Sequence, residues 1–156
     1  MDNELSRGEA AEKYFREGYN CSQAVVLSFS DILGVDKDSL LRIASSFGGG
    51  MGRLREVCGA FSGAMIVLGL LSGYDTPETG KVKAGHYANI QEFAKLFEEN
   101  NGGSIVCREL LHLKKGNESP VPTERTEAFY KTRPCPVIIR NTADLMDAFL
   151  KEKKII

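Results

Sequence analysis

The sequence has few of the patterns that identify a familiar class of enzyme. It holds only two histidines in 156 residues and contains no His-Glu-x-x-His motif; no Ser/His/Asp arrangement and no paired-carboxylate motif can be made out. The run Gly48-Gly49-Gly50 lacks the Gly-Lys-Ser/Thr ending of a phosphate-binding loop, and it is predicted to follow a helix, not a strand. We therefore expect neither metalloprotease chemistry nor nucleotide binding.

An excess of one charge and a long apolar run are also missing. The 20 basic and 21 acidic side chains leave a formal net charge of -1, with no basic patch that could follow a phosphate backbone. The longest apolar stretch, residues 57–71, is shorter than the ~20 residues of a membrane span, and glycines interrupt it. Residues 1–16 do not follow the pattern of a secretory signal. We expect a cytoplasmic protein that binds no nucleic acid and does not insert into membranes.

Alternation of apolar and polar residues, the mark of a half-buried strand, is not sustained anywhere, whereas helical spacing recurs in nearly every segment. We predict an all-α fold, one domain over residues 1–156, with about six to seven helices. Asn20, Asp36 and Ser104 are the expected N-caps of three of them. The helices are predicted at residues 5–17, 21–33, 37–47, 57–71, 82–100, 105–113 and 136–150, with one or two further helical turns within 126–133.

The four cysteines, Cys21, Cys58, Cys107 and Cys135, each lie in the first turn of a different predicted helix. Each shares its helix face with apolar residues three or four positions away, so all four are expected to point inward and to converge. The unpaired N–H groups of a helix start favour thiolate over thiol. Since cytoplasmic thiols are kept reduced, we predict that these cysteines form a catalytic redox site or, in the alternative reading, ligate a metal.

Glycines surround the second cysteine. Gly49 and Gly50 allow the backbone before Cys58 to take positive φ or to approach a bulky group, and Gly59 and Gly63 leave the start of its helix without large side chains. We regard these four glycines as candidate cofactor-binding positions. A close crossing of two helices is the plainer explanation for Gly59 and Gly63.

Two arginines occupy the loop between the glycines and the second cysteine. Arg53 and Arg55 could set the electrostatic potential at Cys58. Of the two, we expect Arg55 to be exposed to solvent.

The ordered set of cysteines and glycines resembles the family named for the pattern C_GCAxxG_C_C, whose members are described as redox-active proteins. The resemblance spans about residues 10–150, with one departure, Val57 where the pattern has Gly. It implies a redox role for all four cysteines and an origin in bacteria or archaea, near oxidoreductases or transporters, and it implies no substrate. The segments that carry it are Tyr19-Asn20-Cys21, Phe47-Gly48-Gly49-Gly50, Cys58-Gly59-Ala60-Phe61-Ser62-Gly63, Cys107 and Cys135.

The first functional hypothesis is thiol–disulfide exchange, in which one thiolate attacks and a second cysteine resolves. Cys58 is the preferred nucleophile, because the glycine loop could leave it reachable. No Cys-x-x-Cys is present, so the pair must meet through the fold, and all three pairings of the four cysteines stay open. The protein would be an oxidoreductase or an accessory electron-transfer protein, and its partner a redox protein or a small-molecule electron carrier.

Two alternatives stay open. Four thiolates could hold an iron–sulfur cluster or another metal for electron transfer, although spacings of 37, 49 and 28 residues differ from the close pairs of ordinary zinc and ferredoxin sites. The cysteines could also pack inertly in a helical interaction module without redox activity. The exposed face of the last helix is a candidate homodimer interface.

Overall fold

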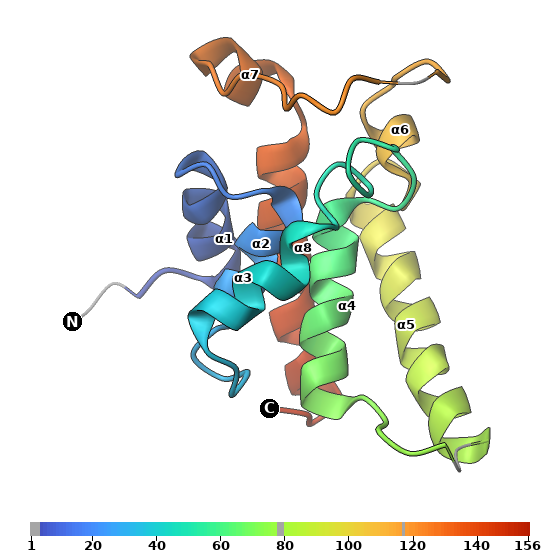
Figure 1. Ribbon diagram of the computed structural model, residues 1–156. Helices are drawn as coiled ribbons and strands as arrows, with labels where there is room; N and C mark the ends of the chain where they lie inside the picture. The colour runs from blue at the N-terminus through green and yellow to red at the C-terminus, as the bar shows by residue number, and fades with distance from the viewer. Residues whose placement is uncertain (1–3, 78–79, 117) are drawn as a thin grey trace.

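Helices make up nearly all the regular structure of the chain. The computed structural model describes residues 4–77, 80–116 and 118–156. Within these ranges there is no β-strand, only an isolated antiparallel bridge between Val57 and Val106. The predicted all-α class is confirmed, and α7 is the helix in the segment where one or two turns were expected. The eight helices (Figure 1) are α1 (Arg7–Arg16), α2 (Cys21–Leu27), α3 (Lys37–Ser45), α4 (Gly59–Ser72), α5 (Gly80–Asn100), α6 (Cys107–Leu110), α7 (Glu127–Thr132) and α8 (Cys135–Glu152).

The buried apolar side chains form one cluster, and every helix except α7 contributes to it. Its centre is aromatic. Phe61 of α4 meets Phe97 of α5 edge to face with 5.4 Å between the ring centroids, and Phe93 of α5 meets Phe149 of α8 at 5.6 Å. A single core of this kind agrees with the single domain that the sequence predicts.

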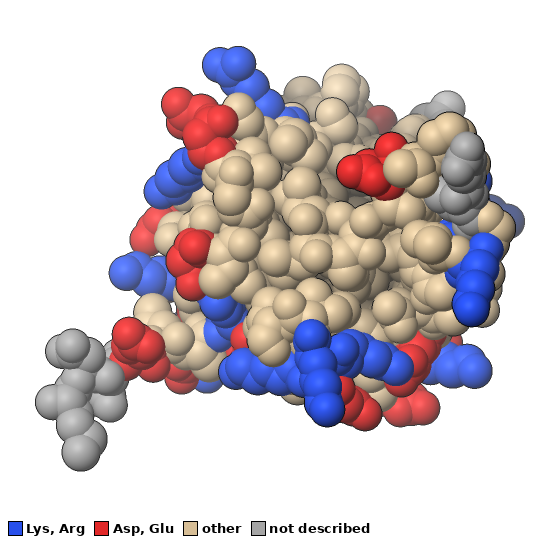
Figure 2. Space-filling view, turned by 90° about the horizontal axis from the view of Figure 1, so that it is seen from below, with Lys and Arg blue, Asp and Glu red and all other residues tan. Residues whose placement is uncertain are grey.

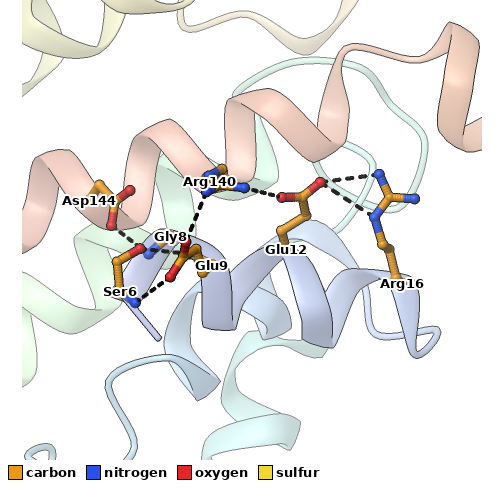
Figure 3. Close-up of polar contacts among 7 residues, drawn as sticks. All are labelled: Ser6, Gly8, Glu9, Glu12, Arg16, Arg140 and Asp144. Atoms are coloured by element: carbon orange, nitrogen blue, oxygen red, sulfur yellow. Dashed lines mark hydrogen bonds and ion pairs between the residues drawn. The ribbon is translucent and has the colours of Figure 1, made fainter. Parts of the chain in front are cut away.

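Close packing of α1 against α8 fixes the position of the last helix (Figure 3). The backbone N–H of Gly8 donates to the carboxylate of Asp144 at 2.6 Å, and a Cβ on Gly8 would collide with the carbonyl oxygen of Arg140. Arg140 also bridges to Glu9 at 3.2 Å and to Glu12 at 3.0 Å. Since exposed ion pairs contribute only ~0–1 kcal/mol each, the glycine contact is the more specific feature. It holds α8, which begins at the fourth cysteine.

A second close crossing joins α2 to α4. A Cβ on Gly63 would lie 2.8 Å from the carbonyl oxygen of Ser22 and 3.1 Å from the Cβ of Val25, so only glycine fits there without a shift. The small residue at this position thus serves helix packing, the plainer of the two explanations for it.

Capping residues mark the starts of α2 and α3 and the end of α4, as the sequence predicts. The side chain of Asn20 accepts from the backbone N–H of Gln23 at 2.8 Å, and Asp36 accepts from that of Ser39 at 2.9 Å. Gly73 follows the last turn of α4. Each polar cap lies directly before the helix that it starts, so the start can be predicted from the local sequence.

One predicted helix is shorter than expected. α2 ends at Leu27, whereas the sequence predicts helix as far as residue 33. Beyond it the N–H groups of Phe29 and Ser30 donate to carbonyls three residues back, on Val26 and Leu27, so the chain continues in tighter turns.

Three helices start later than predicted. α1 begins at Arg7 and not at residue 5. α4 begins at Gly59 and not at residue 57, and α6 spans Cys107–Leu110 and not 105–113. Ser104 is not the N-cap of α6, because the residue before the helix is Val106, whose N–H donates to the Ser104 hydroxyl at 2.9 Å. Val57 and Val106 pair with each other in an extended conformation, so α4 and α6 begin only after these residues.

The molecule has two unlike ends. Figure 2 shows the end away from α6 and α7, where uncharged side chains fill the centre and charged ones lie toward the margin. The starts of α4, α6 and α8 lie at the opposite end (Figure 1). No helix within the described ranges is both long enough and apolar enough to cross a membrane.

Candidate functional site

All four cysteines lie at helix starts. Cys21, Cys107 and Cys135 are the first residues of α2, α6 and α8, and Cys58 is the N-cap residue of α4. All four are free thiols, with Cys58 and Cys107 buried and the other two partly exposed. The predicted placement at four helix starts is confirmed, with Cys58 one position earlier than a first-turn residue.

The four cysteines also line a single inner cavity of about 40 Å³. Its remaining wall is largely apolar, and Arg55 is its one charged lining residue. The predicted convergence of the cysteines is therefore confirmed. Their chemical role stays a prediction. The other lining residues are Gly49, Gly59, Ala60, Leu110, Leu111, Ile138 and Ile139.

Backbone pairing between two distant segments brings the second and third cysteines to this cavity. The N–H of Cys58 donates to the carbonyl of Ile105 at 2.7 Å, and the N–H of Cys107 donates to that of Glu56 at 2.5 Å. These bonds flank the bridge between residues 57 and 106. The sulfurs of Cys58 and Cys107 are therefore positioned by this extended pairing as well as by the starts of α4 and α6.

The glycine loop folds back so that its end meets its beginning. The N–H of Arg55 donates to the carbonyl of Gly49 at 3.0 Å, and Gly49 and Gly50 have φ of 74° and 65°. A Cβ on Gly50 would lie 2.8 Å from the Cβ of Cys107. Positive φ and close backbone approach, both predicted for this loop, are therefore present.

Arg55 is buried, with 6% of its surface exposed, so the expectation that solvent surrounds it is wrong. Its Nη1 lies 3.7 Å from the sulfur of Cys107, and its Nε donates to the carboxylate of Glu118. This hydrogen bond lowers the pKa of the Glu118 carboxyl below its usual range. A guanidinium this close favours negative charge on the Cys107 sulfur.

At the other three cysteines, burial favours the neutral thiol. It raises the pKa of the Cys21 and Cys58 thiols, and that of Cys58 well above its usual range. It also raises the pKa of Cys135 to about 12, an effect that negative charge on Cys21 and Cys107 strengthens and that Arg133 opposes. At these three positions desolvation outweighs the helix start, so the expectation that every helix start favours thiolate is wrong.

A larger outer basin, with a volume of about 270 Å³, adjoins the inner cavity. The two share Cys21, Cys135, Gly49, Arg55 and Leu111, so the partly exposed cysteines face both spaces. The outer basin is also lined by three further arginines, Arg53, Arg125 and Arg133, together with Phe15, Asn20, Gly48, Gly52, Pro120, Pro122, Thr123 and Phe129. It offers a path by which a small molecule could reach the sulfurs.

The four glycines proposed as cofactor-binding positions separate into two groups. Gly49 lines both spaces and Gly59 lines the inner cavity, where a Cβ on Gly59 would collide with the sulfur of Cys21. Gly50 packs on Cys107, and Gly63 packs on α2. A role of these glycines in binding a cofactor stays a prediction.

The ligand geometry of a metal site is not formed by the side chains as they lie. Over residues 4–77, 80–116 and 118–156 no group of three or more Cys, His, Asp or Glu side chains could hold a metal ion. The iron–sulfur reading of the four cysteines stays a prediction.

Three residues of the site could not be identified from the sequence. Glu118, Arg125 and Arg133 lie in a polar segment and its flanks, more than 50 residues beyond the glycine loop that they meet. No spacing or periodicity links such residues to a cysteine. Asn117, beside Glu118, lies outside the described residues.

Comparisons with known proteins agree with this geometry. The model of one family, described as "Putative redox-active protein (C_GCAxxG_C_C)", matches residues 19–149, a range that contains all four cysteines. No match was found among curated proteins or among solved structures. The matched range covers most of the chain and includes both the glycine loop and the four helix starts that form the cavity. The chain thus belongs to the C_GCAxxG_C_C family of redox-active proteins.

Proposed function

We propose that the protein is a thiol–disulfide exchange protein whose inner cavity alternates between a dithiol and a disulfide. One observation carries this proposal: four free thiols from four helix starts line one small cavity, with the buried guanidinium of Arg55 at 3.7 Å from the sulfur of Cys107. Glu118 compensates the buried charge on one side of this guanidinium, and the Nη1 group donates to the sulfur of Cys107 on the other. Inert packing of cysteines would not need such a cation beside a sulfur.

Cys107 is the nucleophile in this proposal, in place of Cys58. Cys58 is buried without a cation at its sulfur among the described residues, and its thiol form is strongly favoured. Cys107 is equally buried, but it accepts from Arg55. The thiolate is the species that attacks a disulfide, so the sulfur beside the guanidinium reacts first.

Cys21 is the resolving cysteine. It lines both the inner cavity and the outer basin, so it lies along the path of an incoming molecule. Negative charge on Cys107 is the main charge that raises the pKa of Cys21. At Cys58 and Cys135, in contrast, the charge of Cys21 has the larger effect. The sulfurs of Cys21 and Cys107 therefore interact electrostatically.

The exchange proceeds in two steps. The Cys107 thiolate attacks one sulfur of a substrate disulfide; the substrate S–S bond breaks, a mixed disulfide forms, and the leaving thiolate takes the proton of Cys21. The Cys21 thiolate then attacks the Cys107 sulfur and releases the second half of the substrate as a thiolate. Two protein thiols are oxidised by two electrons to a disulfide, and the substrate disulfide is reduced to two thiols. An external dithiol reverses the reaction.

The test is to count and map thiols after oxidation. Reduced protein is treated with one equivalent of 2-hydroxyethyl disulfide, and its remaining thiols are alkylated and identified by mass spectrometry. We expect the loss of two thiols and a disulfide between Cys21 and Cys107. The Cys21→Ser variant should stop at a mixed disulfide on Cys107, seen as the added mass of one mercaptoethanol half.

The matched control is Cys58→Ser, which removes a thiol from the same cavity and should leave the Cys21–Cys107 disulfide in place. Rapid exchange in Cys107→Ser, with its fold verified by circular dichroism, would show that another cysteine attacks. Four unreactive thiols in the wild-type protein would favour the inert packing module. A brown protein with iron and labile sulfide after purification without oxygen would favour the cluster.

A further inference from the structure

The outer basin carries an excess of positive charge. Its lining contains four guanidinium groups, those of Arg53, Arg55, Arg125 and Arg133, and no acidic side chain. One carboxylate lies close by, that of Glu118, which pairs with Arg53 at 3.7 Å and with Arg55. Among the residues described, this one anion therefore pairs with two of the four cations.

Two of these arginines have no carboxylate within ion-pair distance in the described part of the chain, and both are half-buried. Arg125 donates to the backbone carbonyls of Phe15 at 2.9 Å and Tyr19 at 3.2 Å, and its guanidinium lies 4.0 Å from the centroid of the Phe15 ring. Arg133 lies 5.6 Å from the Phe129 ring centroid. Backbone bonds and aromatic rings hold these groups in place without neutralising their charge.

We propose that the outer basin binds a small organic disulfide, or the corresponding thiol, that carries a carboxylate on each half, as the substrate of the four-cysteine cavity. This inference rests on the proposed thiol–disulfide exchange. Guanidinium groups match the planar, bidentate geometry of carboxylates. Partly buried cations without partners attract such an anion both at a distance and on contact.

The arrangement of the two spaces fits this substrate. Cys21 and Cys135 form part of the wall between the outer basin and the inner cavity, whereas Arg125 and Arg133 line only the outer basin. A disulfide whose carboxylates meet the arginines would thus present its sulfurs toward the cysteines. The volume of about 270 Å³ lies near the ~300 Å³ lower end of small-molecule pockets, and it suits a small molecule better than a folded protein.

The experiment compares three small disulfides of different charge as oxidants of the reduced protein. These are 3,3′-dithiodipropionate, a dianion; 2-hydroxyethyl disulfide, which is neutral; and cystamine, a dication. The rate of thiol loss with each is divided by the rate at which the same reagent reacts with 2-mercaptoethanol, so that intrinsic reactivity cancels. At low ionic strength we expect the dianion to react about tenfold faster than the neutral reagent, and cystamine more slowly than either. Added salt should reduce the difference.

Substitution assigns the preference to the basin. Arg133→Gln and Arg125→Gln should each reduce the ratio of the normalised rate with 3,3′-dithiodipropionate to that with 2-hydroxyethyl disulfide about tenfold. Arg133→Gln is the safer variant, because Arg125 also holds two backbone carbonyls. The matched control is Arg42→Gln, which removes the same charge from an exposed position on α3 outside the basin.

The outcomes separate this inference from the proposed function. Equal normalised rates for the three reagents, with two thiols still lost in each case, would overturn the anion site and leave thiol–disulfide exchange standing. The same slowing in Arg42→Gln as in Arg133→Gln would also overturn it, since net charge would then explain the effect. No thiol loss with any of the reagents would overturn the exchange function itself, and with it the substrate.

Discussion

Replacing Arg55 by Gln tests the central feature of the site, a guanidinium beside a sulfur. At 3.7 Å, two unit charges attract by about 4 kcal/mol at an effective dielectric constant of about 20. Glu118 holds the other side of the same guanidinium and cancels part of this attraction. A hydrogen bond to a charged group typically contributes ~1.5–3 kcal/mol, and we expect a loss of that order. A loss of this size corresponds to a change of about 10- to 100-fold in the rate at which the Cys107 sulfur reacts.

The assay is alkylation of the reduced protein by iodoacetamide at near-neutral pH. Samples are quenched over time, and the modified fraction of each cysteine is followed by mass spectrometry of its peptide. Because only the thiolate reacts, the rate at Cys107 should fall about 10- to 100-fold in Arg55→Gln. Iodoacetamide is uncharged, so its binding in the outer basin does not depend on the arginines there.

Two further variants separate the local contact from other effects. Arg53→Gln removes the same charge from the same loop, but its guanidinium bonds to Ser119, Thr123 and Glu118 and not to a cysteine. The rate at Cys107 should change less than about threefold in this variant, since a more distant charge is screened. Glu118→Gln keeps Arg55 and frees it from its carboxylate, so the rate should rise. Equal slowing in Arg53→Gln and Arg55→Gln, or an unchanged rate in Arg55→Gln, would refute the reasoning.

Three predictions concern stability, measured by urea unfolding. Gly59→Ala should reduce the free energy of unfolding by about 1–3 kcal/mol, because the added methyl group would collide with the sulfur of Cys21. Gly69→Ala on the same helix has nothing within 4 Å of the added atom and should increase that free energy by about 0.5–1 kcal/mol. Equal effects of the two substitutions would contradict the close contact at Gly59. Since burial raises the pKa of Cys135 from 9.0 to about 12, the stability that its thiol contributes is complete below pH 9 and is lost as the pH rises toward about 12. The urea midpoint of the wild type should therefore fall more steeply over this range than that of Cys135→Ser, and parallel curves would count against a buried thiol. The hydrogen bond from the Ser39 N–H lowers the pKa of Asp36, so Asp36→Ala should reduce stability at neutral pH, and the difference should vanish as the pH falls well below 3.8; a difference that persists in acid would argue against the cap.

Local chemistry explains why the helices were predictable. Asn20 and Asp36 cap their helices through hydrogen bonds to residues three positions later, and Gly73 follows the end of α4, so each signal lies beside the boundary that it sets. The predictions that were wrong depend on distant partners. The late starts of α4 and α6 arise because residues 55–58 pair with residues 105–108, which no local pattern indicates.

The candidate site, too, was predicted only in part. Periodicity predicted the four cysteines at helix starts, but among these helices only α2 has a side-chain cap, that of Asn20. The convergence of the cysteines was predicted from the apolar residues on each helix face. The environment of each sulfur does not follow from either. Arg55 was expected in solvent, yet the loop that carries it folds back on Gly49 and places it at Cys107.

By itself, the sequence determined the helical class and many of the helix boundaries, because these depend on side chains within one or two helical turns of each other. The apolar helix faces predicted that the cysteines converge, but pairing between residues 55–58 and 105–108 brings two of them to the cavity. Only the tertiary structure decided which sulfur has a cation beside it and which three are kept as thiols, because desolvation and charge depend on whatever packs within a few ångströms. Those neighbours come from segments 50 or more residues away, such as Arg55 beside Cys107. The spacing of residues along the sequence does not show which of these distant residues will be neighbours.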